Sequence, residues 1–312
     1  MPSPVAIVDI GSNTIKLLVA ASGARGQAAA LFMRTLDVRI SAGISSSEPR
    51  LGEAGMSAGI AAVRELLADA SRLGAKKIVL VATSAVRDAA NGTVFRSRVR
   101  LETGLVVRIL SGAEEANYIG RGLTCDPALA ALRDFYLFDL GGGSLECLVF
   151  RERRAVQEVS LPLGCVRLTE KYLADPAAPF GAVTAEEISG AVRAAFATAP
   201  FSFSLPDGSR AVGTGGTLTC ARAVIAAREG KTMEQGDPVL PVPILRLLLE
   251  ELGSMPLAER RTIPGLPPRR ADVFPAALAT LIAIAEIGRF PAYNHSLYNL
   301  RWGLAAEELA RG

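Results

Sequence analysis

Histidine is almost absent from this chain of 312 residues, which contains a single one, His295. The cysteines are also few and lie far apart without a CxxC pair, namely Cys125, Cys147, Cys165 and Cys220. Structural zinc sites are built from clusters of these two residue types, so we do not expect one here. Scattered cysteines in a chain of this size instead indicate buried thiols in a reducing compartment.

Aromatic residues make up only 5% of the chain, and the formal net charge is +3. The chain therefore offers few rings for stacking on bases and too little positive charge to indicate a nucleic-acid partner. The arginines nevertheless gather in three stretches: Arg87, Arg96, Arg98, Arg100 and Arg108; Arg151, Arg153 and Arg154; and Arg260, Arg261, Arg269 and Arg270. We interpret most of them as solvated surface, and the alternative is a positive channel that attracts a polyanion.

No hydrophobic run is long enough to span a membrane. The uncharged stretch from Val273 to Ala285 is bounded by Asp272 and Glu286, and its length indicates a buried helix. The N-terminus lacks a basic start, and Asp9 interrupts its apolar run, so it does not resemble a signal peptide. We therefore expect a cytoplasmic protein without a membrane partner.

Hydrophobic residues make up half of the chain, and short apolar runs alternate with amphipathic stretches. The runs predict strands at Val5–Asp9, Ile15–Ala20, Ile78–Thr83, Val106–Leu110, Phe135–Leu140 and Leu145–Phe150. One amphipathic helix is predicted from about Ser57 to Leu73, with Ser57 as its N-cap. Another is predicted to begin at Thr184, with Glu187 completing a capping box. Interleaved strands and helices predict an α/β protein.

One internal repeat dominates the sequence. The segment IVDIGSNTIKLLVA, residues 7–20, aligns without a gap with LFDLGGGSLECLVF, residues 137–150. Asp9 pairs with Asp139 and Gly11 with Gly141 at a constant offset of 130 residues. Each copy predicts a strand, an Asp-x-Gly turn and a second strand. A duplicated α/β domain is therefore expected.

The repeat predicts two domains, 1–128 and 129–312. Their boundary falls between Thr124 and Asp134, where Asp126–Pro127 marks a break. The last helix, at about 300–312, is expected to pack back on the first domain.

Three glycine turns have the composition of phosphate sites. The two Asp-x-Gly turns are joined by a third cluster, Val212–Thr217, which precedes a predicted helix at Leu218–Ala227. Glycine in a tight turn lets backbone N–H groups approach an anion closely, and an aspartate beside the phosphate can hold Mg²⁺. Added side-chain donors are Ser12, Asn13, Ser144 and Thr217. Neither a P-loop nor a dinucleotide fingerprint is present.

Two further motifs follow predicted strands. In TSAVRDAAN, Arg87 is placed to grip a phosphate with its guanidinium fork. In LSGAEEA, Glu114 and Glu115 stand at a helix start, where acidic residues usually complement the helix dipole. One of the two could instead orient a water for attack on phosphorus, and the spacing does not choose between them.

The chain resembles the exopolyphosphatase and guanosine-pentaphosphate phosphatase family. The matching segments run in the family's order from end to end of the chain: IVDIGSNTIKLLV, ATSAVRDAAN, ILSGAEEANYIGRGL, FDLGGGSLE, LPLGCVRLTEKYL, AVGTGGTLT, RRADVFPAAL and LRWGLAAEEL. The resemblance implies two duplicated actin-like domains of the ribonuclease-H-like superfold, with the active site in the cleft between them. It also implies a homodimer.

The resemblance also implies roles for individual residues. Glu115 matches the catalytic base, and Glu114 is then its helix-capping neighbour. Asp139 matches a catalytic aspartate linked to the metal, and Asp9 is its repeat-related partner in holding Mg²⁺, with Mn²⁺ as the alternative ion. Arg87 joins Glu115 and Asp139 as a catalytic residue. The phosphate-contacting positions are Gly11, Ser12, Asn13, Gly141, Gly142, Gly143, Ser144, Gly215, Gly216 and Thr217, with Arg270 as a further candidate.

The predicted function is an exopolyphosphatase, which releases terminal orthophosphate from inorganic polyphosphate by magnesium-assisted attack of a water activated by Glu115. One alternative is hydrolysis of the 5′-γ-phosphate of guanosine pentaphosphate, which uses the same catalytic groups. The other is a phosphate or nucleotide sensor without turnover. The presence of both Glu115 and Asp139 counts against the sensor.

Overall fold

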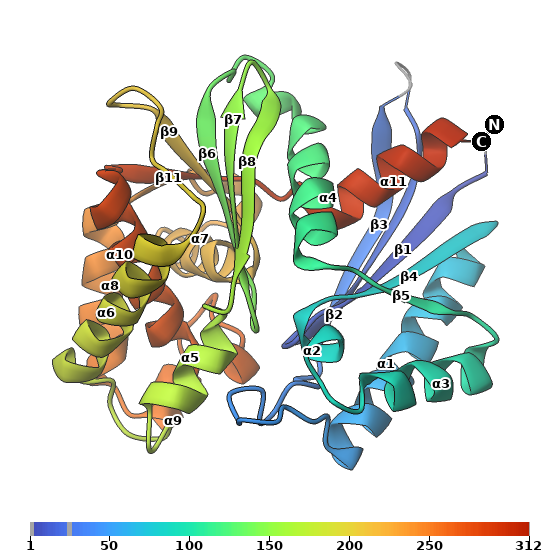
Figure 1. Ribbon diagram of the computed structural model, residues 1–312, viewed down its shortest axis with the longest axis horizontal. Helices are drawn as coiled ribbons and strands as arrows, with labels where there is room; N and C mark the ends of the chain where they lie inside the picture. Colours follow the sequence, from blue (N-terminus) through green and yellow to red (C-terminus); the bar gives the residue numbers. More distant parts are fainter. Residues whose placement is uncertain (1–2, 24–26, 312) are drawn as a thin grey trace. The chain divides into compact units, whose positions relative to one another are not determined.

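The computed structural model describes residues 3–23 and 27–311, and the chain divides into two compact units (Figure 1). The first unit comprises Met1–Ala131 and Tyr298–Gly312, and the second comprises Leu132–Leu297. Each unit contains a mixed β-sheet with helices packed on it. The predicted α/β class is therefore confirmed.

The sheet of the first unit has the order β3-β2-β1-β4-β5, with β1 (Val5–Ile10), β2 (Thr14–Ser22), β3 (Ala28–Asp37), β4 (Lys77–Ala82) and β5 (Val107–Ile109). The first three strands form an antiparallel meander, and β4 and β5 continue the sheet parallel to β1. The helical segments are α1 (Glu53–Arg72), α2 (Ser84–Arg87), α3 (Gly92–Thr103), α4 (Gly112–Thr124), η1 (Pro127–Leu129) and α11 (Leu300–Arg311).

The sheet of the second unit has the order β8-β7-β6-β9-β11-β10, with β6 (Phe135–Leu140), β7 (Leu145–Arg151), β8 (Arg154–Leu161), β9 (Arg210–Thr214), β10 (Val239–Pro241) and β11 (Ala292–His295). It repeats the first plan, because β6–β8 form a meander while β9 and β11 run parallel to β6. The helical segments are α5 (Cys165–Tyr172), α6 (Ala182–Thr198), α7 (Gly216–Arg228), η2 (Met233–Gln235), α8 (Val242–Ser254), α9 (Leu257–Arg260), η3 (Pro268–Arg270) and α10 (Phe274–Gly288).

The strand pairing confirms the internal repeat. In the first sheet Asp9 pairs with Lys16, and in the second Asp139 pairs with Glu146. The two hairpins therefore keep one register at the offset of 130 residues seen in the sequence. In both sheets the first hairpin strand also pairs with a parallel strand, which is the predicted ribonuclease-H-like arrangement of a duplicated domain.

Burial explains why these strands hold their positions. All of β1 is buried, and Ala6, Val8 and Ile10 belong to the core that also contains Ile60 of α1. Since side chains alternate along a strand, Asp9 lies on the opposite face of the sheet from that core. In the second unit α10 is buried over the whole stretch from Phe274 to Ala285, as predicted. Among the described residues, no helix is long and apolar enough to cross a membrane.

Two helix starts differ from the prediction. Helix α1 begins at Glu53 after Gly52, one turn before the predicted cap at Ser57, because buried Met56 extends the apolar face. Helix α6 begins at Ala182 after Gly181, two residues before Thr184. Neither cap residue makes a side-chain hydrogen bond, so the serine and threonine signals pointed to the wrong positions.

One predicted surface arginine lies in the interior. Arg260 ends the short helix α9 within the proline-rich segment, and its side chain is fully buried. Its guanidinium donates to carbonyl oxygens at three places, those of Leu252, Met255 and Ala271, at 2.7, 2.7 and 3.0 Å. Arg260 therefore anchors a mostly exposed segment to the second unit. Of the four cysteines, three are buried and Cys125 is partly buried.

Candidate active site

The glycine turn of the first unit connects β1 to β2. The Gly11 amide donates to the Thr14 carbonyl at 3.0 Å and so closes the turn. The Ser12 carbonyl accepts from both the amide and the hydroxyl of Ser41, at 3.3 and 3.0 Å. The Asn13 carbonyl accepts from the amides of Val38 and Arg39, at 3.0 and 2.9 Å. The turn is thus held from one side through its carbonyl oxygens.

Peptide geometry determines the direction of one amide in this turn. In a trans peptide the C=O and the following N–H point in opposite directions. With the Ser12 carbonyl directed at Ser41, the amide of Asn13 points away from that loop. Successive amides that point the same way can form a concave site for an anion. The amide of Gly11 is already used within the turn, so any such donors would come from the residues that follow it.

The glycine turn of the second unit, between β6 and β7, is anchored in the same way. The Gly141 amide closes the turn on the Ser144 carbonyl at 3.0 Å. The carbonyls of Gly141, Gly142 and Gly143 accept from the first residues of α5, namely from the Cys165 amide, the Val166 amide and Nε of Arg167 at 3.0, 2.9 and 3.0 Å. Gly164 permits this approach, because a Cβ there would lie 2.3 Å from the carbonyl carbon of Gly142.

The third glycine turn brings three predicted site groups of the second unit together. Gly215 has a φ of +92°, and a Cβ there would lie 2.5 Å from Oδ1 of Asp139. A Cβ at Gly216 would lie 1.7 Å from Nη1 of Arg270. Thr217 is buried in the first turn of α7. Only glycines at these two positions leave room for the carboxylate of Asp139 and the guanidinium of Arg270 beside the turn.

In the first unit one short helix makes polar contacts with both the glycine turn and the predicted base. The hydroxyls of Ser12 and Ser84 lie 3.0 Å apart, and both residues are buried. Ser84 begins α2 and Arg87 ends it, so one short helix carries both groups. Nη1 of Arg87 donates to Oε2 of Glu115 at 2.8 Å and to the carbonyl of Leu110 at 3.1 Å. Glu115 is therefore oriented by the same helix that contacts the turn.

The structure separates the roles of the two adjacent glutamates. Glu114 forms a capping box with Ser111, accepting from the Ser111 amide at 2.9 Å. That bond, followed by the contact with Arg108, lowers the pKa of Glu114 from 4.5 to about 2. Glu115 is buried and contacts Arg87 instead. The helix-capping role predicted for Glu114 is confirmed.

Three carboxylates at the ends of the central strands bear on metal binding. Oδ1 of Asp9 is buried and has no hydrogen-bond partner within the residues that the structure describes. Asp139 has Glu146 as its cross-strand neighbour, and buried Glu146 accepts from the hydroxyl of Ser160 at 2.8 Å. A buried carboxylate oxygen without a donor is costly, and a cation would satisfy it.

The donor set fits Mg²⁺ better than a softer ion. No group of three or more histidine, cysteine, aspartate or glutamate residues that could hold a metal occurs in residues 3–23 and 27–311. Mg²⁺ does not need such a group, because it keeps several waters and is usually bound by one or two carboxylates with substrate phosphates. Asp9 and Asp139, each within its own unit, are therefore candidate ligands.

Two residues beside the candidate site, Ser84 and Glu146, were not predicted from the sequence. Ser84 stands in the TSAVRD segment, but its contact with Ser12 spans 72 residues and has no local signal. The position of Glu146 beside Asp139 was detectable from the repeat. Glu146 aligns there with Lys16, and each of the two lies directly across its hairpin from the repeated aspartate.

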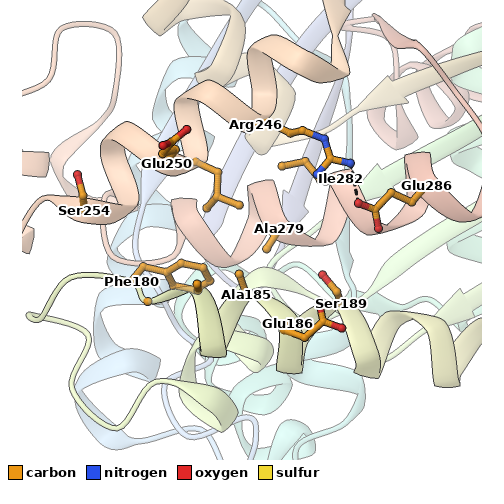
Figure 2. Close-up of a pocket in the computed structure, with 13 residues that line it drawn as sticks. Phe180, Ala185, Glu186, Ser189, Arg246, Glu250, Ser254, Ala279, Ile282 and Glu286 are labelled. Carbon is orange, nitrogen blue, oxygen red and sulfur yellow. Dashed lines mark hydrogen bonds and ion pairs between the residues drawn. The ribbon is translucent and has the colours of Figure 1, made fainter.

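A groove in the second unit lies away from all of these residues. It has a volume of about 420 Å³ and runs between α6 and α8 over α10 (Figure 2). Ala279 and Ile282 of α10 line it together with Phe180, and Arg246 pairs with Glu286 at 2.6 Å beside it. None of the predicted site residues lines this groove.

Comparisons with known proteins identify the family of this chain. Residues 18–311 match the model of the Ppx/GppA phosphatase family. The chain is 31% identical over 304 residues to exopolyphosphatase 2 of Mycobacterium tuberculosis, covering 91% of this chain and 90% of that protein. It is 28% identical to guanosine-5′-triphosphate,3′-diphosphate pyrophosphatase of Photobacterium profundum, covering 98% of this chain and 59% of that protein.

A solved structure shares the fold. The crystal structure of an exopolyphosphatase from Cytophaga hutchinsonii superposes with a TM-score of 0.84 at 20% identity, covering 99% of this chain and 98% of that one. Its likeness extends over both units of this chain. With a family match over nearly the whole length and a relative above 30% identity, the chain belongs to the Ppx/GppA phosphatase family, whose named members hydrolyse phosphoanhydride bonds.

Proposed function

We propose that this phosphatase is an exopolyphosphatase, which removes the terminal phosphate from inorganic polyphosphate. The relative from M. tuberculosis supports this choice, because it is named exopolyphosphatase 2 and matches this chain over nine-tenths of both lengths. The glycine turns support it on physical grounds. Their amides recognise phosphate oxygens without requiring a base or a sugar.

One observation carries the proposal more than any other. Helix α2 carries both the hydroxyl that contacts Ser12 of the glycine turn and the guanidinium that contacts the buried carboxylate of Glu115. An acid paired with an arginine is common on protein surfaces, but here both the hydroxyl pair and the carboxylate are buried. Such an arrangement suits a base that must be held at a fixed place relative to a bound phosphate.

In the proposed reaction a water attacks the terminal phosphorus. Glu115 accepts one proton from that water as the new P–O bond forms. The bond between the terminal phosphorus and the bridging oxygen breaks, and the shortened polyphosphate leaves with that oxygen. Arg87 orients the Glu115 carboxylate, and the turn amides hold the phosphoryl oxygens on which negative charge accumulates.

The proposal includes Mg²⁺, with Mn²⁺ as the alternative ion. Asp139 and Asp9 are the residues that would hold it. A bound divalent ion would neutralise phosphate charge and stabilise the charge that develops during transfer. The buried Asp9 Oδ1 without a hydrogen-bond donor is the observation that supports a cation here.

Hydrolysis of guanosine pentaphosphate is the second candidate. It is supported by the relative from P. profundum, which is named for a guanosine polyphosphate. The same turn amides and the same glutamate would act on the 5′-γ-phosphate. Polyphosphate remains our first choice because the relative from M. tuberculosis matches this chain at higher identity, 31% against 28%.

The two adjacent glutamates provide a matched test of the mechanism. We expect Glu115→Gln to lower kcat for release of orthophosphate from tripolyphosphate about 10²–10⁴-fold, the usual contribution of a positioned base. Glu114→Gln changes the same functional group one residue away and should leave kcat within a few-fold of the wild type. Equal effects of the two substitutions on kcat, in folded variants, would refute the role of Glu115.

A further inference from the structure

The chain's single histidine belongs to a hydrogen-bonded relay that ends at the third glycine turn. His295 is the last residue of β11 and is buried. Its Nε2 lies 3.2 Å from the hydroxyl of Thr219 in α7. The same hydroxyl donates to the carbonyl of Gly215 at 2.9 Å. Two consecutive hydrogen bonds therefore connect His295 through Thr219 to the glycine turn, although His295 is 76 residues from Thr219 in the chain.

Proton counting assigns the tautomer of His295. The hydroxyl of Thr219 has one hydrogen, and it is used on the Gly215 carbonyl. The ring must then donate from Nε2 to the threonine oxygen. This leaves Nδ1 as an acceptor, and Nδ1 is buried without a hydrogen-bond partner in the described part of the chain. A buried acceptor left unpaired is tolerated better than a buried N–H donor, so the opposite tautomer is disfavoured.

The relay supplies one of the two bonds that fix the direction of the Gly215–Gly216 peptide. The Gly215 carbonyl accepts from both the hydroxyl and the amide of Thr219, at 2.9 and 3.3 Å. With that carbonyl directed into α7, the amide of Gly216 points out of the helix N-terminus, because the peptide is trans and planar. Gly215 is also the residue packed against Asp139, and Gly216 the one packed against Arg270. A rotated Gly215–Gly216 peptide would disturb both contacts.

We propose that His295 is a positioning residue for phosphate binding, which holds the Gly215–Gly216 peptide in its binding orientation through Thr219. This role rests on the proposed function, since the turn is taken there as a phosphate site. His295 itself contacts neither phosphate nor metal in this scheme. It acts by fixing the rotamer of Thr219, and the consequence is a turn that is already oriented before the substrate arrives.

Four variants separate positioning from packing. His295→Phe keeps a buried ring but cannot donate to Thr219, whereas His295→Gln restores an N–H at about the position of Nε2. Thr219→Val removes the hydroxyl at nearly constant shape. Thr280→Val is the matched control, because the buried Thr280 likewise donates to the carbonyl four residues back, that of Ala276 at 2.8 Å, in a helix of the same unit.

The first measurement is nitrogen-15 NMR of the ring, which gives resonances from one histidine only. At pH 7 the wild type should show a protonated Nε2 and an unprotonated Nδ1, and Thr219→Val should shift the Nε2–H resonance. The opposite tautomer would overturn the relay. This experiment requires no catalytic activity, so it is independent of the proposed function.

The second measurement is tripolyphosphate turnover, with calorimetric binding of tripolyphosphate alongside it. We expect His295→Phe and Thr219→Val each to lower kcat/KM about tenfold, mainly by raising KM, since displaced binding groups act on this scale or above it. The double variant should lose no more than either single one, and His295→Gln and Thr280→Val should stay close to the wild type.

The outcomes distinguish the two proposals. Wild-type turnover in His295→Phe would overturn the positioning role and leave the exopolyphosphatase proposal standing. An inactive wild type would overturn the exopolyphosphatase proposal. In that case the tripolyphosphate affinity still decides, because unchanged affinity in both His295→Phe and Thr219→Val would overturn the positioning role, and a loss shared by the two would support it.

Discussion

Replacing Gly216 with alanine should displace the guanidinium of Arg270 without removing the arginine from the chain and without disrupting α7. The added Cβ would lie 1.7 Å from Nη1 and 2.5 Å from Cζ of Arg270, far inside van der Waals contact. The obstructing atoms belong to the end of a long side chain, so the guanidinium moves rather than the backbone. Gly216 is the first residue of α7, where alanine favours the helix by up to about 1 kcal/mol over glycine. Stability should therefore stay equal or rise.

The loss of activity can be estimated from the contact that is broken. A hydrogen bond to a charged group contributes about 1.5–3 kcal/mol, and 1.4 kcal/mol corresponds to a factor of ten. If Arg270 binds phosphate, Gly216→Ala should lower kcat/KM for tripolyphosphate about 10–100-fold. Arg270→Ala should produce a loss of similar size, and the double variant should lose little more than either single one.

A second glycine provides the control for this experiment. Gly190 lies within α6, and a Cβ there would meet nothing within 4 Å. Gly190→Ala should raise the free energy of unfolding by about 0.5–1 kcal/mol and leave turnover unchanged. Urea unfolding and orthophosphate release would be measured on all four variants. Full activity in a folded Gly216→Ala variant would refute the assignment of Arg270 to the phosphate site.

Three further predictions concern stability. Burial, with a smaller effect of Arg222, lowers the pKa of His295 from 6.5 to about 4, so the unfolded chain binds the proton first as the pH falls. This group should therefore cost about 2 kcal/mol of stability between pH 7 and 5, a loss that urea titrations should not find in His295→Gln. Ser111→Ala should cost about 1 kcal/mol of stability. The pKa of Glu114, read by NMR, should stay below 4.5 because its largest cause, the residue-111 amide, remains. Arg260→Met leaves the carbonyls of Leu252, Met255 and Ala271 without their guanidinium donor, so it should lower the urea midpoint strongly while sparing turnover per folded molecule; an unchanged midpoint would contradict the contacts.

The parts of the fold that were predictable are those with a local or repeated pattern. The Asp-x-Gly hairpins appear twice in the sequence with the same spacing, and their strands pair in the same register. The buried helix α10 was visible because an apolar run with charges at both ends has few alternatives. Helix starts were less predictable, since glycine caps at Gly52 and Gly181 carry no side-chain signal.

The candidate site was predictable where it follows a motif and not where it depends on contacts between distant residues. Glu115 and Glu114 were left undecided by spacing, and only the capping box and the Arg87 contact distinguish their surroundings. The contacts Ser12–Ser84 and Thr219–His295 join residues far apart in the chain, so no local pattern announces them. Arg260 shows the converse, because a charged residue among prolines looks exposed until its carbonyl partners are known.

We propose that this chain releases terminal phosphate from polyphosphate with Glu115 as the base. The most direct test is orthophosphate release in the presence of Mg²⁺ from short polyphosphate, long polyphosphate and guanosine pentaphosphate, with wild type and Glu115→Ala side by side. We predict release from polyphosphate by the wild type and its near-complete loss in the folded variant. Release from guanosine pentaphosphate alone would favour the second candidate, and tight binding without release from any substrate would contradict the claim.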